Sequence, residues 1–137
     1  MNKIDEFLKS ALAKNSSDLH FISGDPARVR VHGSLTLLGQ EKLTIDFVKE
    51  CMYEIMSGGL QKDFETFDAV DFAYEIPDVS RFRVNVMRHL NGIGAVFSAI
   101  PSQALTLEEL NMPDSIRQMC RQTQGMILVT GKTGSGK

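Results

Sequence analysis

The stretch 68-DAVDFAYEIPDVSRFRVNVMRHLNGIGAVFSAIP-101 decides the fold. It contains three runs with β-type alternation of apolar and polar residues, separated by Pro77-Asp78 and by Asn91-Gly92. An Asn-Gly pair between alternating runs is a strong hairpin signal, and proline ends a strand. The stretch therefore predicts an antiparallel meander over residues 68–77, 79–90 and 92–101.

The sequence before the meander predicts helices and a hairpin. Apolar residues recur every three or four positions in the first helix, which should end near Asn15. A strand over 18–22 and a hairpin over 29–38, with its tight turn at Gly33-Ser34, follow. Thr44 fits the N-cap of a helix that ends at the Ser-Gly-Gly of 57–59. The apolar residues that should point inward from this helix are Ile45, Val48, Met52, Ile55 and Met56.

A second short helix is expected over residues 60–67. Taken with the meander, these elements place residues 1–100 in the α+β class, as an antiparallel sheet with helices on one face. The segment 101–112 is expected to be a linker, because Pro101 stops the last strand and Thr106 and Glu109 form a capping-box pattern.

Residues 113–137 are predicted to open an α/β nucleotide-binding domain. A helix should begin at Asp114 or Ser115. The apolar run 126–129 then suits a strand that is buried on both faces of a parallel sheet. It leads into a glycine-rich loop at the end of the chain.

The loop 131-GKTGSGK-137 has the spacing G-x-x-x-x-G-K of a Walker A motif. Glycines let backbone N–H groups approach phosphate oxygens, and Lys137 would reach the β- and γ-phosphates. The predicted cofactor-binding residues are Gly131, Lys132, Thr133, Gly134, Ser135, Gly136 and Lys137. The alternative is a flexible tail with an accidental match.

The loop stops before the Ser or Thr that would hold Mg²⁺ with its hydroxyl. We therefore expect the chain to be a fragment of a longer enzyme that binds ATP and Mg²⁺, and we expect the fragment alone not to hydrolyse ATP.

Composition excludes several classes of protein. A hydrophobic content of 42% with 23% charged residues indicates a globular chain. The net charge of −2 gives no electrostatic reason to expect nucleic acid as a partner. No apolar run approaches the ~20 residues of a membrane span, and the amphipathic N-terminal segment, which carries acidic residues, is not expected to be a signal peptide. These features, with two distant cysteines, Cys51 and Cys120, suit the cytoplasm.

No metal site is expected, because His20, His32 and His89 are scattered without a second ligand at metal spacing. Asp18 and Glu75 would form a carboxylate pair for acid–base chemistry if the fold brought them together. Cys51 and Cys120 are each expected to be inert core thiols rather than metal ligands.

Six short motifs then carry a family resemblance. They are SDLH (17–20), RVHG (30–33), RFRVN (81–85), GAVFSAIP (94–101), LTLEEL (105–110) and the terminal loop. In this order they resemble the PilT-like retraction ATPases of type IV pili, within the type II/IV secretion ATPase superfamily. The resemblance implies a PAS-like N-terminal domain, a linker and a RecA-like core. It also implies a cytoplasmic homohexamer that binds ATP between subunits and powers pilus retraction and twitching motility.

The resemblance further implies peripheral association with the inner membrane through a pilus platform protein, without insertion into the bilayer. Two alternatives stay open. One is a related secretion or conjugation ATPase with the same domain pair. The other is a free-standing PAS-like sensor or dimerisation module that binds a small ligand.

Arg81 and Arg83 stand two apart on a predicted strand, so both project from one face. The resemblance implies that they reach across a subunit boundary to the γ-phosphate; spacing alone is typical of a solvated face with ordinary ion pairs. One departure is Ser98, where relatives commonly carry arginine. Either Arg81, Arg83 or Arg88 then supplies the missing cation, or coupling between nucleotide and motion is altered.

Overall fold

The structure is a computed structural model and describes residues 2–101 and 105–131. The chain divides into two compact units, residues 1–101 and residues 102–137, which are described separately. The elements of the first unit, in chain order, are α1 (Ile4–Ala13), β1 (Asp18–Ile22), β2 (Pro26–Val31), β3 (Ser34–Lys42), α2 (Ile45–Ile55), α3 (Gly58–Phe67), β4 (Ala69–Ile76), β5 (Ser80–His89) and β6 (Gly92–Ile100). The second unit contains α4 (Asp114–Cys120).

The first unit is built on one antiparallel sheet with the strand order β3-β2-β1-β6-β5-β4. The first and last strands of the unit pair in its centre, where Leu19 of β1 lies opposite Phe97 of β6. The predicted meander forms β4, β5 and β6, and their pairing is antiparallel throughout. The α+β class and the antiparallel sheet are therefore confirmed.

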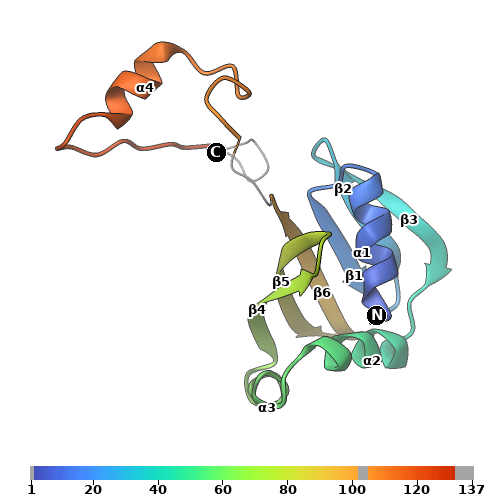
Figure 1. Cartoon of the computed structure of the whole chain (residues 1–137). Coiled ribbons are helices and arrows are strands. Elements are labelled where there is room, and N and C mark those ends of the chain that lie inside the picture. Colours follow the sequence, from blue (N-terminus) through green and yellow to red (C-terminus); the bar gives the residue numbers. More distant parts are fainter. Residues whose placement is uncertain (1, 102–104, 132–137) are drawn as a thin grey trace. The chain divides into compact units, whose positions relative to one another are not determined.

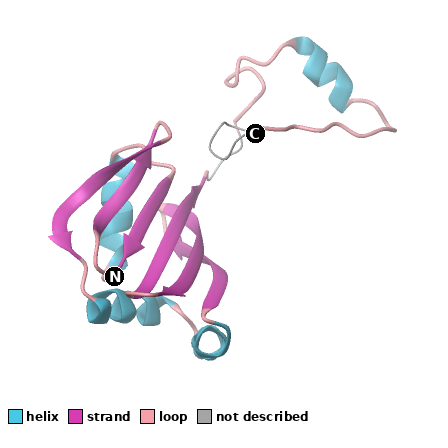
Figure 2. Cartoon of the chain, turned by 180° about the vertical axis from the view of Figure 1, so that it is seen from behind, coloured by secondary structure: helices cyan, strands magenta, loops and turns pink. Residues whose placement is uncertain are grey.

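Figure 1 shows α1 lying over one face of the sheet and α2 and α3 along its lower end. Alternate strand residues point toward α1, α2 and α3, and the core forms between the two layers. Its largest fully buried side chains include Phe21, Phe64, Phe82, Phe97 and Leu8. Seen from behind, the sheet presents a second face that α1 does not cover (Figure 2). We call this second face the helix-free face.

The β2–β3 hairpin turns one residue earlier than predicted. Val31 pairs with Ser34, so the turn residues are His32 and Gly33, with φ of 47° and 82°. Positive φ at both central positions is typical of the type I′ turn, whose twist matches the flanking strands. The predicted Gly33-Ser34 turn was wrong because histidine, rather than the serine after glycine, takes the first left-handed position.

Thr44 caps α2 as predicted, and its hydroxyl accepts a hydrogen bond from the N–H of Phe47 at 3.2 Å. The boundary after it differs from the prediction. Ser57 is the N-cap of α3, so Gly58 opens that helix instead of closing α2. The predicted inward position of Ile45 is also wrong, because this side chain in the first turn is 51% exposed.

The second unit, as far as it is described, holds little regular structure. The predicted capping box forms: the backbone N–H of Thr106 donates to Glu109 at 2.8 Å, and the N–H of Glu109 donates to the Thr106 hydroxyl at 3.2 Å. The strand predicted over 126–129 does not form, and its side chains are 53–80% exposed. A buried parallel strand needs partners on both sides, and no strand occurs elsewhere in residues 105–131.

Candidate functional site

The helix-free face carries both arginines that the sequence singled out. On β5, Phe82 and Val84 are buried in the core at 2% and 0% exposure. Because side chains alternate along a strand, Arg81 and Arg83 point to the opposite side. Both are exposed. The prediction that these two guanidinium groups share one face is consistent with the strand geometry.

Arg83 has an acidic neighbour across the β4–β5 pair. Its Nη2 lies 3.5 Å from Oδ1 of Asp71, and the side-chain amide of Asn85 donates to the other oxygen of Asp71 at 3.2 Å. The arginine side chain is 72% exposed. An ion pair as open as this is worth about 0–1 kcal/mol, so it orients Arg83 without immobilising it.

Arg81 is free in the described part of the chain, where it makes no ion pair or side-chain hydrogen bond. Its register neighbours are Glu75 on β4 and Ile100 on β6. Both arginines can therefore reach a ligand that approaches this face, Arg81 at once and Arg83 after leaving Asp71.

A polar row, defined here as Arg30, Asp18, Ser98 and Arg83, crosses four neighbouring strands of this face. The Ser98 hydroxyl donates to Oδ1 of Asp18 at 2.7 Å. The other oxygen of Asp18 lies 3.4 Å from Nε of Arg30 and accepts from the Ser17 hydroxyl at 2.8 Å. Ser98 thus bonds to a carboxylate that Arg30 already neutralises.

His20 follows Asp18 on β1, two positions further along the strand. Its Nε2 atom is buried and has no hydrogen-bond partner among the described residues. Burial lowers the pKa of the imidazole, the nearby Arg30 lowers it further, and Asp18 partly opposes both. His20 is therefore a neutral imidazole at neutral pH.

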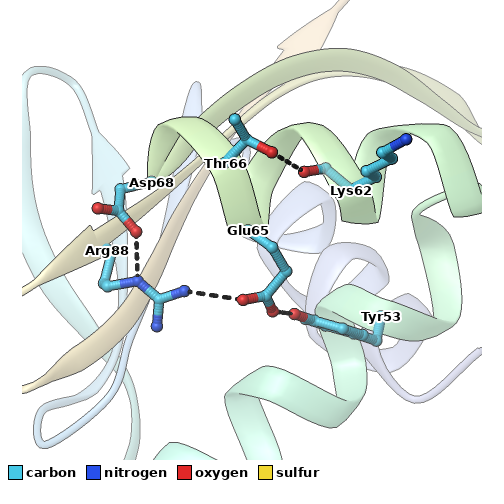
Figure 3. A network of polar contacts seen from close by, with 6 residues as sticks. All are labelled: Tyr53, Lys62, Glu65, Thr66, Asp68 and Arg88. Atoms are coloured by element: carbon cyan, nitrogen blue, oxygen red, sulfur yellow. Dashed lines mark hydrogen bonds and ion pairs between the residues drawn. The ribbon is translucent and has the colours of Figure 1, made fainter.

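Arg88 stands on the other side of the sheet, among the helices. Its Nε lies 2.6 Å from Oδ1 of Asp68, and its Nη2 lies 3.4 Å from Glu65, which also accepts from the Tyr53 hydroxyl (Figure 3). The guanidinium group lies 5.1 Å from the ring centroid of Phe64. Arg88 therefore ties α3 to β5, and it cannot join Arg81 and Arg83 in compensating for Ser98.

Other candidate residues do not assemble into a site. Asp18 and Glu75 lie on β1 and β4, which β5 and β6 separate, so the fold does not pair these carboxylates. Within residues 2–101 and 105–131, no three His, Cys, Asp or Glu side chains gather closely enough to hold a metal ion.

The two thiols have different surroundings. Cys51 is buried, and this burial, reinforced by the nearby Glu54, raises the pKa of its thiol to about 11. Cys120 is exposed on α4, where no residue is buried, so the prediction that it is a core thiol is wrong.

The predicted phosphate-binding loop lies mostly outside the described residues. Gly131 is described, whereas Lys132, Thr133, Gly134, Ser135, Gly136 and Lys137 are not. None of the helices in the described ranges has the length and apolar character that a bilayer span requires.

Sequence reasoning missed Asp71 and Asn85 as neighbours of Arg83. The signal was present in the alternation of the meander. Val70 and Phe72 point inward, so Asp71 must point outward, and the hairpin register sets it opposite Asn85. Strand parity together with the position of the turn could have placed these side chains beside the arginine.

Known proteins resemble this chain along its whole length. The family described as "Type II/IV secretion system protein" matches residues 1–137. The chain is 42% identical over 134 residues to PilT of Pseudomonas aeruginosa, a type IV pilus retraction ATPase, and this match covers 98% of the chain and 39% of that protein.

Two solved structures share its fold. The pilus retraction motor PilT with bound ADP has a TM-score of 0.79 at 32% identity, over 100% of this chain and 40% of that one. The ATPase DotB of Legionella pneumophila has a TM-score of 0.79 at 26% identity, over 98% of this chain and 38% of that one. The chain thus spans about two fifths of the length of these relatives. With a family match over every residue, this chain belongs to the type II/IV secretion system protein family.

Proposed function

We propose that this chain is the N-terminal part of a hexameric ATPase motor that powers type IV pilus retraction. The observation that carries the proposal is the 42% identity to a retraction ATPase over 98% of the chain. The proposed parts are an N-terminal domain over residues 1–100, a linker over 101–112 and the start of a RecA-like ATPase core over 113–137.

The proposed nucleotide site is the loop from Gly131 to Lys137. Its glycine N–H groups and the ammonium group of Lys137 would hold the phosphates of ATP, with Mg²⁺ bound in the longer protein. The PilT structure with bound ADP supports nucleotide binding in this family.

Arg81 and Arg83 are proposed to act on the nucleotide of a neighbouring subunit. A guanidinium group presents several donors in a fixed fork, which suits the equatorial oxygens of a transferring phosphoryl group. Arg83 would exchange the Asp71 carboxylate for phosphate, and the exposed geometry of that ion pair keeps the exchange inexpensive. Asp71 would then hold the arginine ready while the site is empty.

The proposed partners are five further copies of the same protein and a pilus platform protein at the inner membrane, which the motor would approach from the cytoplasm. The N-terminal domain of one subunit would pack on the core of the next. This arrangement supplies the geometry that arginines acting between subunits require.

The first test uses the gene product read through to its stop codon. We expect a hexamer that hydrolyses ATP, and we expect Lys137→Ala to abolish turnover while the hexamer persists. Mass in solution and phosphate release measure both. An absent reading frame beyond Lys137, or a long form without turnover, would overturn the proposal.

The arginine assignment has its own test in that long form. We expect Arg81→Ala and Arg83→Ala each to lower kcat by about 10²-fold or more, the loss typical of removing one transition-state donor. Arg28→Ala is the matched control, because Arg28 lies on the same face but is held by Asp25 at 2.6 Å. Equal losses in all three variants would refute a specific role for the two arginines.

The likeness to DotB supports a second candidate, a secretion ATPase of the same family that serves another machine. Deletion of the gene separates the two. Loss of twitching with retained secretion supports retraction, and the reverse result supports the second candidate. A free-standing sensor would show neither loss.

A further inference from the structure

A pocket of about 560 Å³ lies between the edge strand β3 and the helices α1 and α2. Its lining includes Phe7 of α1, Ala27 of β2 and Phe47 of α2, so it opens on the helix side of the sheet, away from Arg81 and Arg83. Pockets that bind small molecules have volumes of roughly 300–1,000 Å³. This hollow is therefore large enough for a ligand of its own.

A bulge in β3 creates the pocket. Arg28 pairs with Leu37, but Pro26, two residues earlier on β2, pairs with Lys42, five residues later on β3. Three extra residues therefore sit in β3 and lift the strand off its partner. Beneath the bulge, β2 presents Ala27, whose short, buried side chain leaves the space unfilled.

The inner wall of the pocket is aromatic. Phe7 and Phe47 line it, and both rings pack on the fully buried Phe21, with ring centroids 5.0 Å and 6.0 Å from it. The centroids of Phe7 and Phe47 lie 6.2 Å apart. Rings fixed in this way offer faces and edges to a planar apolar group at little entropic cost.

The rim of the pocket carries a positively charged side chain, Lys42. Lys42 makes no ion pair in the described part of the chain, although it lies near enough to Asp25 to help lower the pKa of that carboxyl, after the larger effect of Arg28. Gln40 is likewise without a side-chain hydrogen bond there. Glu41 shares the rim, and its negative charge disfavours a ligand with several anionic groups.

We propose that this pocket binds a small amphiphile with a planar aromatic body and one anionic group, of the class of aromatic carboxylates. The aromatic body lies against Phe7 and Phe47 over Ala27, and the carboxylate faces Lys42. Thr44, the N-cap of α2, lies at the same rim, where the helix dipole adds to the attraction. The pocket lies on the opposite side of the sheet from Arg81 and Arg83.

The test uses the 137-residue chain and the probe 2-naphthoate, with uncharged 2-naphthamide as its isostere. The chain contains no tryptophan, so naphthalene fluorescence is read without overlap from tryptophan emission. We expect saturable binding with a Kd below about 1 mM. In ¹H–¹⁵N spectra the shifts should concentrate at residues 39–44 and at Phe47.

Variants locate the site and its charge preference. Gly39 lines the pocket, and a Cβ added there meets nothing within 4 Å, so Gly39→Leu should fold and block binding. Ala27→Val fills the floor independently. Gly58→Leu is the control, because Gly58 is equally open but lies outside the pocket. Lys42→Gln should weaken 2-naphthoate up to about fivefold and leave 2-naphthamide unchanged.

Each outcome either supports or overturns the site. Loss of binding in Gly39→Leu or Ala27→Val with a native-like spectrum, and retained binding in Gly58→Leu, support it. No saturable shift at millimolar probe overturns the proposal. So do shifts centred elsewhere, or unchanged binding in both filling variants. Equal weakening of the two probes by Lys42→Gln refutes the choice of an anionic ligand.

Discussion

Gly92 is the position where one added methyl group should do the most damage. It opens β6 with φ of 125°, which L-residues rarely adopt. A Cβ there would stand 2.6 Å from the hydroxyl oxygen of Ser23 and 3.0 Å from Cγ1 of Ile45. Ser23 is 3% exposed and cannot move into solvent. Gly92→Ala therefore combines backbone strain with a clash in a buried site.

The hydroxyl of Ser23 ties several groups of the adjacent turn together. It accepts from the N–H of Ile93 at 3.1 Å, lies 3.2 Å from the carbonyl oxygen of Asn91, to which it donates, and lies 3.3 Å from Nε2 of His89. Displacing it costs about 1 kcal/mol for each of two or three bonds. The strained backbone adds about 1–3 kcal/mol. We expect Gly92→Ala to lower the free energy of unfolding by about 3–6 kcal/mol.

Thermal and urea unfolding followed by circular dichroism measures this loss. For a unit of this size, each kcal/mol shifts Tm by about 4 °C, so we expect a fall of roughly 12–24 °C. Gly58→Ala is the control: an added Cβ meets nothing within 4 Å in the first turn of α3, so stability should hold or rise by up to about 1 kcal/mol. A loss below about 1 kcal/mol for Gly92→Ala would refute the reasoning.

Single side chains give three further predictions. Thr44→Ala removes the N-cap of α2 and should cost about 1 kcal/mol in urea unfolding; an unchanged midpoint would count against the cap. Cys120 should react with a thiol reagent at once, whereas Cys51, with its pKa of about 11, should react only on unfolding; equal rates would contradict its burial. Burial, and then its hydrogen bond to a carboxylate, raises the pKa of Tyr74 from 10.0 to about 12. The folded state thus holds this proton more tightly, so its contribution to stability is complete below about pH 10 and is lost as pH rises toward 12. Wild-type stability should fall more steeply over that range than that of Tyr74→Phe, and parallel curves would contradict this.

Much of the sheet could be predicted because alternation and turn residues act locally. Along most of their length, the runs that became β4, β5 and β6 alternate between more exposed and more buried side chains, and this arrangement hides Phe82, Val84 and Phe97 together. The predicted turn before β3 was wrong by one residue. A glycine indicates one of the two left-handed positions of such a turn, but it does not show whether the second left-handed position comes before or after it.

The run 126–129 shows where local pattern is insufficient. Its apolar residues satisfy the composition of a buried parallel strand, yet they are exposed and unpaired in the structure. A strand is a property of two or more segments, because its N–H and C=O groups need partners on a neighbouring chain segment. Composition alone supplies no such partner.

Parity explains both a failure and a success at the candidate site. Arg88 is seven positions from Arg81, an odd separation, so a regular strand sends the two to opposite faces; Asp68 and Phe64 then hold Arg88 on the helix side. Counting positions along the strand is therefore sufficient to separate Arg88 from the other two arginines. Arg83 is two positions from Arg81, an even separation, so the same rule places both side chains on one face.

The bulge in β3 cannot be predicted by counting positions along a single strand. The sequence of residues 34–42 is typical of one continuous strand. The three extra residues are defined only by the pairing of this strand with β2. The pocket depends on that register offset and on Ala27 of the neighbouring strand β2. Because these two features belong to different strands, the periodicity of one segment does not reveal them. The wall opposite these strands comes from Phe7 of α1 and Phe47 of α2, so the hollow is a product of tertiary packing. A candidate ligand site can therefore arise from residues that are individually ordinary, and here its chemistry follows from geometry and not from a motif.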